Sequence, residues 1–300
     1  MIYDIRHITR FDYGANVKFA RCNLRLKPIH WSGQDLLDYR LTISPSGRVS
    51  PARAEAGLAN VVRMVVDEPV RHLTIESVSR IAVDRPVPMP SNGSPTLAKI
   101  AAAARASHDP SPAGPANYLF PSPLIPLDRD IADWCAQDLQ PDRPALDAAI
   151  ALAQRIQHDF AFDSEATLVD TAPHEAFMKR GGVCQDFAQI MITGLRAAGL
   201  PAAYASGYIR TIPPPGEARL VGADATHAWV LLWCGAELGW VGVDPTNGIW
   251  MAGDHIVMAI GRDYGEIAPI DGVVLGSSAQ KMDLSVDVAP VIEGVPQGVA

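Results

Sequence analysis

The sequence predicts an α+β fold in which a cysteine-bearing helix packs on an antiparallel sheet, preceded by an N-terminal β-rich, sandwich-like domain. Residues 1–85 contain short segments in which apolar and polar residues alternate, the period of a half-buried strand. Further along, two helical patterns precede the cysteine helix, and short apolar segments follow it. This order of helices and then strands is typical of an α+β core.

The composition is that of an ordinary globular protein: of 300 residues, 48% are hydrophobic and 19% are charged. This length allows two domains and a sizeable core. The net charge of −8 argues against nucleic acid or an anionic membrane as a partner. Residues 1–20 lack the apolar core of a signal peptide, and no apolar stretch approaches the roughly 18 residues of a membrane span. We therefore expect a cytoplasmic protein.

The N-terminal domain is expected over residues 1–85. At least four strands are predicted there at the spacing of a β-sandwich, in Ile2–Ile8, Leu37–Ile43, Val61–Val66 and Leu73–Ile81. A linker is expected over residues 86–125, because ten of the 25 prolines fall between positions 86 and 126. One short alanine-rich helix, Thr96–Ala106, interrupts the linker and needs a surface to pack on. Apolar residues in Asn117–Pro121 are expected to anchor the linker to the core.

The second domain is expected over residues 126–265, with a C-terminal β extension at 266–300. Apolar residues from Leu146 to Phe160 recur at helical spacing, and Pro173–Arg180 forms a second short helix. Gly181 and Gly182 end that helix and leave room for a substrate. A helix of about 16 residues then begins near Cys184, and Gly199 with Pro201 stops it. Strands follow at Ala202–Arg210, which Pro213–Gly216 breaks, and then around His227 and before Asp244.

Cys184, His227 and Asp244 are the candidate catalytic residues. The free N–H groups and positive dipole end of a helix favour thiolate, lowering a cysteine pKa from roughly 8.5 towards neutrality or below. His227 enters a short apolar segment typical of a buried strand, and Asp244 ends another such segment before a proline and a turn. If the two strands pair, Asp244 can accept from one imidazole nitrogen while the other faces the sulfur.

Each of these residues also has a structural interpretation. A lone cysteine in a helix is more often buried core than nucleophile, a lone histidine in an apolar strand is usually a core residue, and aspartate before proline is usually a turn former. The two glycines before Cys184 and the polar residues after it favour chemistry. For Asp186 we prefer the structural interpretation, a charge at the helix start, because an anion beside Cys184 would oppose thiolate formation.

The four cysteines are far apart in the sequence and form no Cys-x-x-Cys pair. This pattern predicts reduced thiols and neither a zinc site nor a disulfide framework. Three of them, Cys22, Cys135 and Cys234, are expected to be packing residues. There is also no D-x-D-x-D-G loop, so we expect no metal and no cofactor.

Three motifs resemble those of the bacterial transglutaminase-like proteins, whose core is related to the papain-like cysteine enzymes. Gly182, Cys184 and Asp186 match the Gly-x-Cys-x-Asp pattern. His227–Trp229 matches His-Ala-Trp, and Asp244–Thr246 matches Asp-Pro-Thr. The resemblance also reaches the N-terminal β-rich region, the Asp-His-Ile segment at 254–256 and the Gly-Arg-Asp-Tyr segment at 261–264. It implies a transglutaminase-like core in which Cys184 is the nucleophile, His227 the base and Asp244 its orienter.

The expected activity is cysteine-dependent acyl transfer on a peptide, isopeptide or glutamine-type amide of a peptide or protein substrate. Hydrolysis through a thioester is preferred; protein cross-linking by transamidation and a catalytically silent peptide-binding module are the alternatives, and a thiol-redox protein is disfavoured because no resolving cysteine is near Cys184. The backbone N–H of Cys184 is an expected oxyanion donor. Gln185, Trp229 and Trp240 are candidates for the oxyanion site or the substrate lining, although both tryptophans are also explained as core packing. The sequence does not indicate the oligomeric state.

Overall fold

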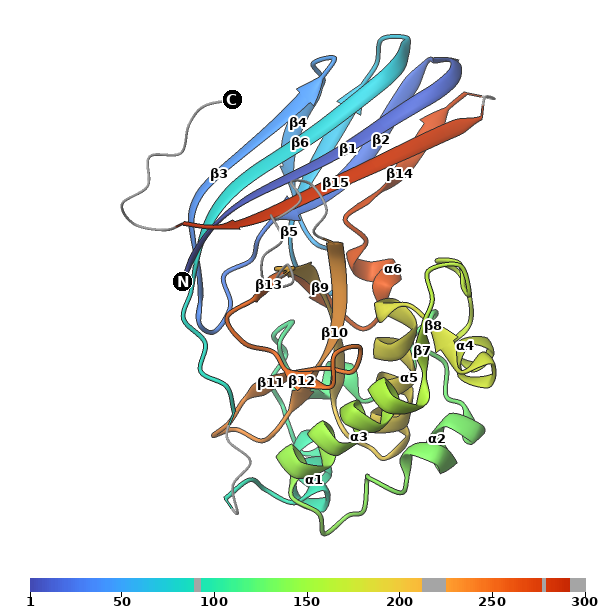
Figure 1. Cartoon of the computed structure of the whole chain (residues 1–300). Helices are drawn as coiled ribbons and strands as arrows, with labels where there is room; N and C mark the ends of the chain where they lie inside the picture. Colours follow the sequence, from blue (N-terminus) through green and yellow to red (C-terminus); the bar gives the residue numbers. More distant parts are fainter. Residues whose placement is uncertain (89–92, 212–224, 277–278, 292–300) are drawn as a thin grey trace, which may run out of the picture.

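The computed structural model describes residues 1–88, 93–211, 225–276 and 279–291. Figure 1 shows long strands gathered at one end of the molecule and the larger helices at the other, with shorter strands between them. This arrangement of a β-rich N-terminal region and a core that contains both helices and sheet confirms the predicted α+β fold. Among the described residues, no helix is long and apolar enough to cross a membrane.

The N-terminal region contains six strands, two more than were identified from the sequence. They are β1 (Ile2–Val17), β2 (Phe19–Lys27), β3 (Gln34–Ser44), β4 (Arg48–Ala52), β5 (Leu58–Val66) and β6 (Val70–Val83). The four predicted strands lie within β1, β3, β5 and β6. In β2, buried Ala20, Cys22 and Leu24 alternate with more exposed polar residues, which is the period of a strand. In β4, almost every residue is exposed and Pro51 interrupts the pattern, so no apolar signal marks it.

Two strands near the C-terminus return to the N-terminal region, as Figure 1 shows. β15 (Gln280–Pro290) pairs with β1 from Tyr3 to Tyr13, and β14 (Ile270–Leu275) pairs with β2. The order β15-β1-β6-β3 makes a four-stranded sheet. This sheet packs against β2 and β5 through one shared apolar cluster, to which both layers contribute: Phe11, Tyr13, Leu24, Leu26, Met64, Val66, Leu73 and Ile75. Two facing layers around one core make the sandwich that the alternating pattern predicts.

The second sheet continues from the N-terminal region into the core. Its order is β12-β11-β10-β9-β13-β5-β2-β14, with β4 also paired to β5. The core strands are β9 (Ala202–Ile209), β10 (Ala225–Trp233), β11 (Trp240–Asp244), β12 (Ile249–Trp250) and β13 (His255–Gly261). Because Ala259 of β13 pairs with Ala59 of β5, the two regions share backbone hydrogen bonds. The segment Pro213–Gly216, which is predicted to end the strand at Ala202–Arg210, lies outside the described residues.

Helices cover one face of the core strands. They are α1 (Leu97–Arg105), α2 (Arg129–Cys135), α3 (Ala145–Asp159), α4 (Pro173–Lys179), α5 (Cys184–Ala197) and the short α6 (Tyr264–Ile267). The 3-10 turn η1 (Pro115–Tyr118) lies on the other side, where Tyr118 packs. Alternation along β10 separates two apolar clusters: Ala228, Val230 and Leu232 pack with the helices, whereas Trp229 and Leu231 pack on the other side. The linker crosses both clusters, since α1 joins the first and Tyr118 joins the second. Of the expected linker anchors, Phe120 is instead exposed.

The cysteine helix α5 is the most buried helix of the core, with every residue from Gln185 to Arg196 buried. Its length is 14 residues, close to the 16 expected, and Gly199 follows it with a φ of +74°, a conformation that glycine adopts without strain. α2 packs against it at Gly194, where an added Cβ would lie 2.3 Å from the sulfur of Cys135. The absence of a side chain at Gly194 thus allows the two helices to approach closely.

A buried hydrogen-bond chain joins the four-stranded sheet to the core strands. His7 of β1 bonds through Nδ1 to the hydroxyl of Tyr208 on β9 at 2.8 Å and through Nε2 to the hydroxyl of Thr9 at 2.9 Å. Burial lowers the pKa of His7 to about 4 and raises that of the Tyr208 hydroxyl well above its ordinary value. His7 is therefore uncharged at neutral pH, and both of its ring nitrogens are used.

Acid should weaken the fold through His7. The unfolded chain binds a proton at this imidazole below pH 6.5 and the folded chain only near pH 4, so stability is lost as pH falls through that window and is unaffected above it. From this shift we expect a contribution of about 2 to 3 kcal/mol between pH 7.5 and 4.5. Urea unfolding of the wild type and of His7→Gln at both values measures it: the pH-dependent loss should be smaller in the variant, and equal losses would refute the assignment.

Candidate active site

The segment that leads into Cys184 makes a sharp change of direction. α4 is followed by Arg180, whose φ of 54° lies in the left-handed region. Gly181 and Gly182 then form β8 (Gly181–Gly182), which pairs in parallel with β7 (Ala161–Phe162). α5 begins directly after Val183, so Cys184 occupies the first turn of the helix, where backbone N–H groups have no partner within the helix.

Asp186 has the structural role that we preferred for it. Its Oδ2 accepts from the backbone N–H of Val183 at 2.8 Å and from the hydroxyl of Thr167 at 2.6 Å, so it caps the helix start and ties down the loop after β7. Burial raises the pKa of this carboxyl group. An added Cβ at Gly182 would lie 2.4 Å from the same oxygen. The space at Gly182 that we expected a substrate to use is therefore filled by the Asp186 carboxylate.

His227 lies near the start of β10 and joins two of the predicted residues. Its Nε2 is 2.7 Å from Oδ2 of Asp244, and Cys184 lies near enough to the ring to interact with it electrostatically. Burial disfavours the charged ring, but the interactions with Asp244 and Cys184 outweigh burial and raise the pKa of His227 to about 10. The structure thus brings the three predicted residues together, with His227 hydrogen-bonded to Asp244 and interacting with Cys184.

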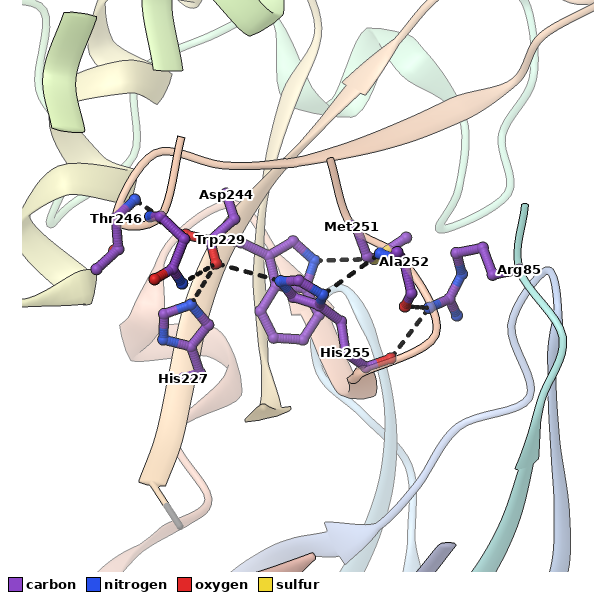
Figure 2. A network of polar contacts seen from close by, with 9 residues as sticks. Arg85, His227, Trp229, Asp244, Thr246, Met251, Ala252 and His255 are labelled. Carbon is purple, nitrogen blue, oxygen red and sulfur yellow. Dashed lines mark hydrogen bonds and ion pairs between the residues drawn. The ribbon is translucent and has the colours of Figure 1, made fainter. Parts of the chain in front are cut away.

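Asp244 is completely buried at the end of β11 (Figure 2). Its Oδ1 accepts from the backbone N–H groups of Thr246 at 2.9 Å and Asn247 at 3.3 Å. Its Oδ2 accepts from the side-chain amide of Asn247 at 2.7 Å, from His227 and from His255 at 3.1 Å. Burial acts to raise the pKa of this carboxyl group, but the bonds from the two histidines prevail and hold it far below its usual range. Asp244 is therefore an anion that can balance a positive imidazole.

His255 is a member of this site whose role the sequence did not reveal. It is buried at the start of β13 and bonds to the same carboxylate oxygen as His227. We noted its Asp-His-Ile segment only as part of a family resemblance. His255 follows Asp244 by eleven positions in the chain. In the sheet, however, β10 and β9 lie between their strands, an order that the sequence does not show. The available signal was a polar residue that opens a strongly apolar strand segment.

Gln185 is next to the sulfur but is already engaged. Its side-chain Nε2 donates to the carbonyl oxygen of Val169 at 2.8 Å and holds the loop between β7 and α4 against the helix start. Only 8% of the residue is exposed. The amide keeps one further N–H, so an oxyanion role for Gln185 stays a prediction.

The two candidate tryptophans are not exposed beside Cys184. Trp229 is fully buried, stacks near His227 with ring centroids 6.0 Å apart, and donates its indole N–H to the sulfur of Met251. Trp240 begins β11, at the opposite end of this strand from Asp244, and packs edge-on against Tyr118 while donating to the carbonyl oxygen of Ala113. Both positions favour the core-packing interpretation over a substrate lining.

Two groups of side chains among the described residues are close enough together to hold a metal ion. In the first, His227 and His255 both bond to Asp244, so these groups already satisfy one another. The second consists of Asp128, Asp130 and His174 near the surface, where Asp128 caps α2 and bonds to His174. Hydrogen bonding therefore accounts for the first group, and in the second group for Asp128 and His174.

A hollow of about 950 Å³ lies elsewhere on the molecule and is not part of this site. It is lined by residues 52–59, by the linker near Tyr118, and by Arg262 and Glu266. None of the three predicted catalytic residues lines it. We place the chemistry at Cys184 because the hydrogen-bonded residues are there, whereas the hollow has no nucleophile in its lining.

Comparison with known families supports both regions of the chain. Residues 3–82 match the bacterial transglutaminase-like N-terminal region, and residues 133–245 match the transglutaminase-like superfamily. The second match contains Cys184, His227 and Asp244. It ends before His255, which therefore lies outside the matched core segment.

Similar proteins include an uncharacterized protein of Mycobacterium tuberculosis, which is 36% identical over 298 residues that cover 96% of this chain and 92% of the relative. A protein-glutamine gamma-glutamyltransferase of Pseudomonas aeruginosa is 41% identical over 135 residues, which cover 43% of this chain and 20% of that enzyme. Among solved structures, one from Cytophaga hutchinsonii, provisionally described as a cysteine protease, has a TM-score of 0.74 at 18% identity and covers 97% of this chain and 92% of its own. That likeness shows the shared fold.

Alkylation should distinguish Cys184 from the other three cysteines. Cys184 is partly exposed, whereas the others are buried, and burial raises the pKa of Cys22 to about 11 and of Cys135 and Cys234 to about 12. We expect iodoacetamide to modify Cys184 at least tenfold faster than any other cysteine, as followed by peptide mass spectrometry. A Cys184→Ser control should lose the fast phase, and faster labelling of a buried cysteine would be inconsistent with the site.

Proposed function

This chain belongs to the transglutaminase-like superfamily and has its bacterial N-terminal region, and from this membership we propose that it is a cysteine-dependent acyl-transfer enzyme. Its proposed substrate is a peptide, isopeptide or glutamine-type amide in a peptide or protein. One observation carries the proposal: Cys184, at the start of α5, interacts with His227, and His227 is hydrogen-bonded to the buried anion Asp244. These are the parts that activate a sulfur nucleophile.

The first half of the proposed reaction forms a thioester. The Cys184 sulfur attacks the carbonyl carbon while His227 holds the proton that the thiol gives up, and Asp244 balances the charge on the imidazole. As the tetrahedral intermediate collapses, the carbon–nitrogen bond breaks and His227 gives that proton to the departing amine. The backbone N–H of Cys184, at the start of α5, is suited to stabilise the oxyanion.

The second half releases the acyl group and restores the sulfur. His227 takes a proton from water, and the resulting hydroxide attacks the thioester carbonyl. The carbon–sulfur bond then breaks, the product acid leaves, and the proton on His227 again balances the thiolate. Asp244 holds the imidazole in one orientation through both halves, so a single base serves two proton transfers.

We propose water as the acyl acceptor. A cross-linking enzyme has to exclude water from its thioester and admit a lysine side chain, which calls for a dry acceptor channel. Trp229, one candidate wall for such a channel, is buried, and Trp240 is held by Tyr118 and Ala113. Cys184 is itself partly exposed. Transamidation is the alternative, supported by the Pseudomonas aeruginosa relative that is described as a gamma-glutamyltransferase.

A catalytically silent peptide-binding module is the remaining alternative. Burying an ion pair contributes little net stability, since desolvation of both charges opposes their attraction. A module without catalysis would therefore gain little from keeping Asp244 fully buried against His227. The buried His227–Asp244 pair beside Cys184 favours an active enzyme over this alternative.

Substitutions in the series should have unequal effects. Cys184→Ala and His227→Ala should abolish turnover of an accepted amide, while Asp244→Asn should lower kcat/KM about 10²- to 10⁴-fold because the imidazole loses its anionic partner. Steady-state rates and circular dichroism separate loss of chemistry from loss of fold. Asp142→Asn, on an exposed turn, is the matched control. Wild-type rates in either alanine variant would disprove the catalytic roles.

The acceptor can be identified by competition. We expect an accepted acyl donor, supplied with millimolar primary amine, to give mainly the free acid, because nothing in the described site favours an amine over water. Mass spectrometry of the products measures the ratio of acid to amine adduct. A predominant adduct would show that the enzyme is a transamidase and would leave the roles of Cys184, His227 and Asp244 unchanged.

A further inference from the structure

We propose that His255 is a positioning residue for the pair His227 and Asp244. From a separate strand, His255 donates a hydrogen bond to the Asp244 carboxylate and so holds that carboxylate toward His227. This role rests on the proposed function, because it acts through Asp244 and His227 and not on the substrate. Figure 2 shows the two imidazoles on the same carboxylate, with Trp229 drawn beside them.

The hydrogen bonds of His255 determine which ring nitrogen carries the proton. The backbone N–H of Ala252 donates to Nδ1 at 3.3 Å, so Nδ1 is the acceptor. The proton is therefore on Nε2, which lies 3.1 Å from Oδ2 of Asp244 and donates to it. The ring is 1% exposed, so water does not compete for either nitrogen.

His255 differs from the other donors to Asp244 in where it comes from. Thr246 and Asn247 are in the turn that follows Asp244, so their bonds hold the carboxylate only relative to its own turn. His255 opens β13, which is separated from β11 by β10 and β9 in the sheet. Its bond therefore fixes the carboxylate relative to the body of the sheet that also carries His227.

The His255 ring is itself held in place on two sides. Trp229 meets it edge-on, with centroids 5.2 Å apart, and the His227 ring lies 6.1 Å away. Arg85, which follows β6 of the N-terminal region, donates through Nη1 to the carbonyl oxygens of Ala252 at 3.1 Å and His255 at 3.0 Å. The backbone of Ala252 and His255, which positions the imidazole, is thus tied to the N-terminal region.

The hydrogen bond from His255 also lowers the basicity of the Asp244 carboxylate. A carboxylate that accepts an additional N–H is a weaker base and stabilises a neighbouring imidazolium less. In the acyl-enzyme, His227 must be neutral to take a proton from water. Loss of the His255 donor should therefore raise the pH at which His227 becomes able to promote deacylation.

The charged and titratable groups around this pair are few among the described residues. Cys184 faces His227 from α5, and Arg85 contacts the His255 backbone from the segment after β6. Asp254, adjacent to His255, is paired with Arg210 at the end of β9 and accepts from the hydroxyl of Tyr3. Substitution of His255 leaves all of these groups in place.

The test follows hydrolysis of an acetyl group from Cys184. The intact protein is acetylated with p-nitrophenyl acetate, excess ester is removed, and loss of the acetyl mass is measured across pH. In His255→Phe, which keeps an aromatic ring but has no N–H donor, we expect the midpoint of deacylation to rise by about half a pH unit to one unit. We expect the deacylation rate on the high-pH plateau to fall about tenfold, because the variant lacks one hydrogen bond to a charged group. His255→Gln, which restores an N–H near the position of Nε2, should bring both the midpoint and the plateau rate most of the way back to the wild-type values.

The control is His72→Phe, which removes another imidazole that bonds to a carboxylate, that of Asp12, on the exposed surface of the N-terminal region. It should behave as the wild type. An unchanged or lower midpoint in His255→Phe, or an unchanged plateau, would overturn the positioning role while leaving the proposed function intact. A wild-type Cys184 that takes no acetyl group would overturn the proposed function and this role with it.

A measurement on the wild type covers the case in which His255→Phe does not fold. Nitrogen-detected NMR of labelled imidazoles reports which nitrogen of each histidine carries a proton. We expect the His255 signals to show a proton on Nε2 and none on Nδ1 near neutral pH. A proton on Nδ1 would exclude donation to Asp244 and overturn the proposal.

Discussion

The site depends on a carboxylate that is buried without losing its charge. Taking an ionised group out of water is costly unless hydrogen bonds replace its hydration. Asp244 accepts five hydrogen bonds, three from the turn that follows it and two from histidines on other strands. The turn bonds make burial possible, and the histidine bonds connect the charge to the sheet. Without this anion, His227 would have no partner to balance a positive ring, and Cys184 would lack the base that we propose for it.

Sheet pairing sets the distances within the site. β10 pairs with β11 from Trp233 to Val230, which brings the start of one strand beside the end of the other and places His227 next to Asp244. β9 pairs with both β10 and β13, so His255 enters from a fourth strand. The helix α5 is packed tightly on this sheet through its buried residues, which brings its first turn and Cys184 to the imidazole. The geometry of the proposed catalytic site thus follows from strand register and helix packing, with the loops contributing mainly caps.

Much of this could be predicted from the sequence because local patterns carried it. Gly181 and Gly182 before an amphipathic segment predicted the start of α5, and apolar runs around His227 and before Asp244 predicted β10 and β11. What could not be predicted is what depends on partners far away in the chain. His255 reaches Asp244 through the strand order, and Arg85 bonds to backbone carbonyl oxygens, so no local pattern predicts the contacts of either residue. The sequence predicts space for a substrate at Gly182, but the Asp186 carboxylate fills it. This contact forms only when the first turn of α5 folds Asp186 back toward Gly182, so the sequence does not show it. β4 was missed because it is an exposed strand with a proline.

The most direct measurement is to trap the covalent intermediate formed from an amide. Peptides containing glutamine, lysine isopeptide and ordinary amide bonds would be mixed with the protein, quenched in acid, and searched for an acyl group on each digested fragment. A thioester on the fragment that holds Cys184, removed by neutral hydroxylamine and absent from Cys184→Ala, is the result expected of this site. An acyl group on a serine, threonine or other cysteine, or amide cleavage that persists in Cys184→Ala, would contradict it.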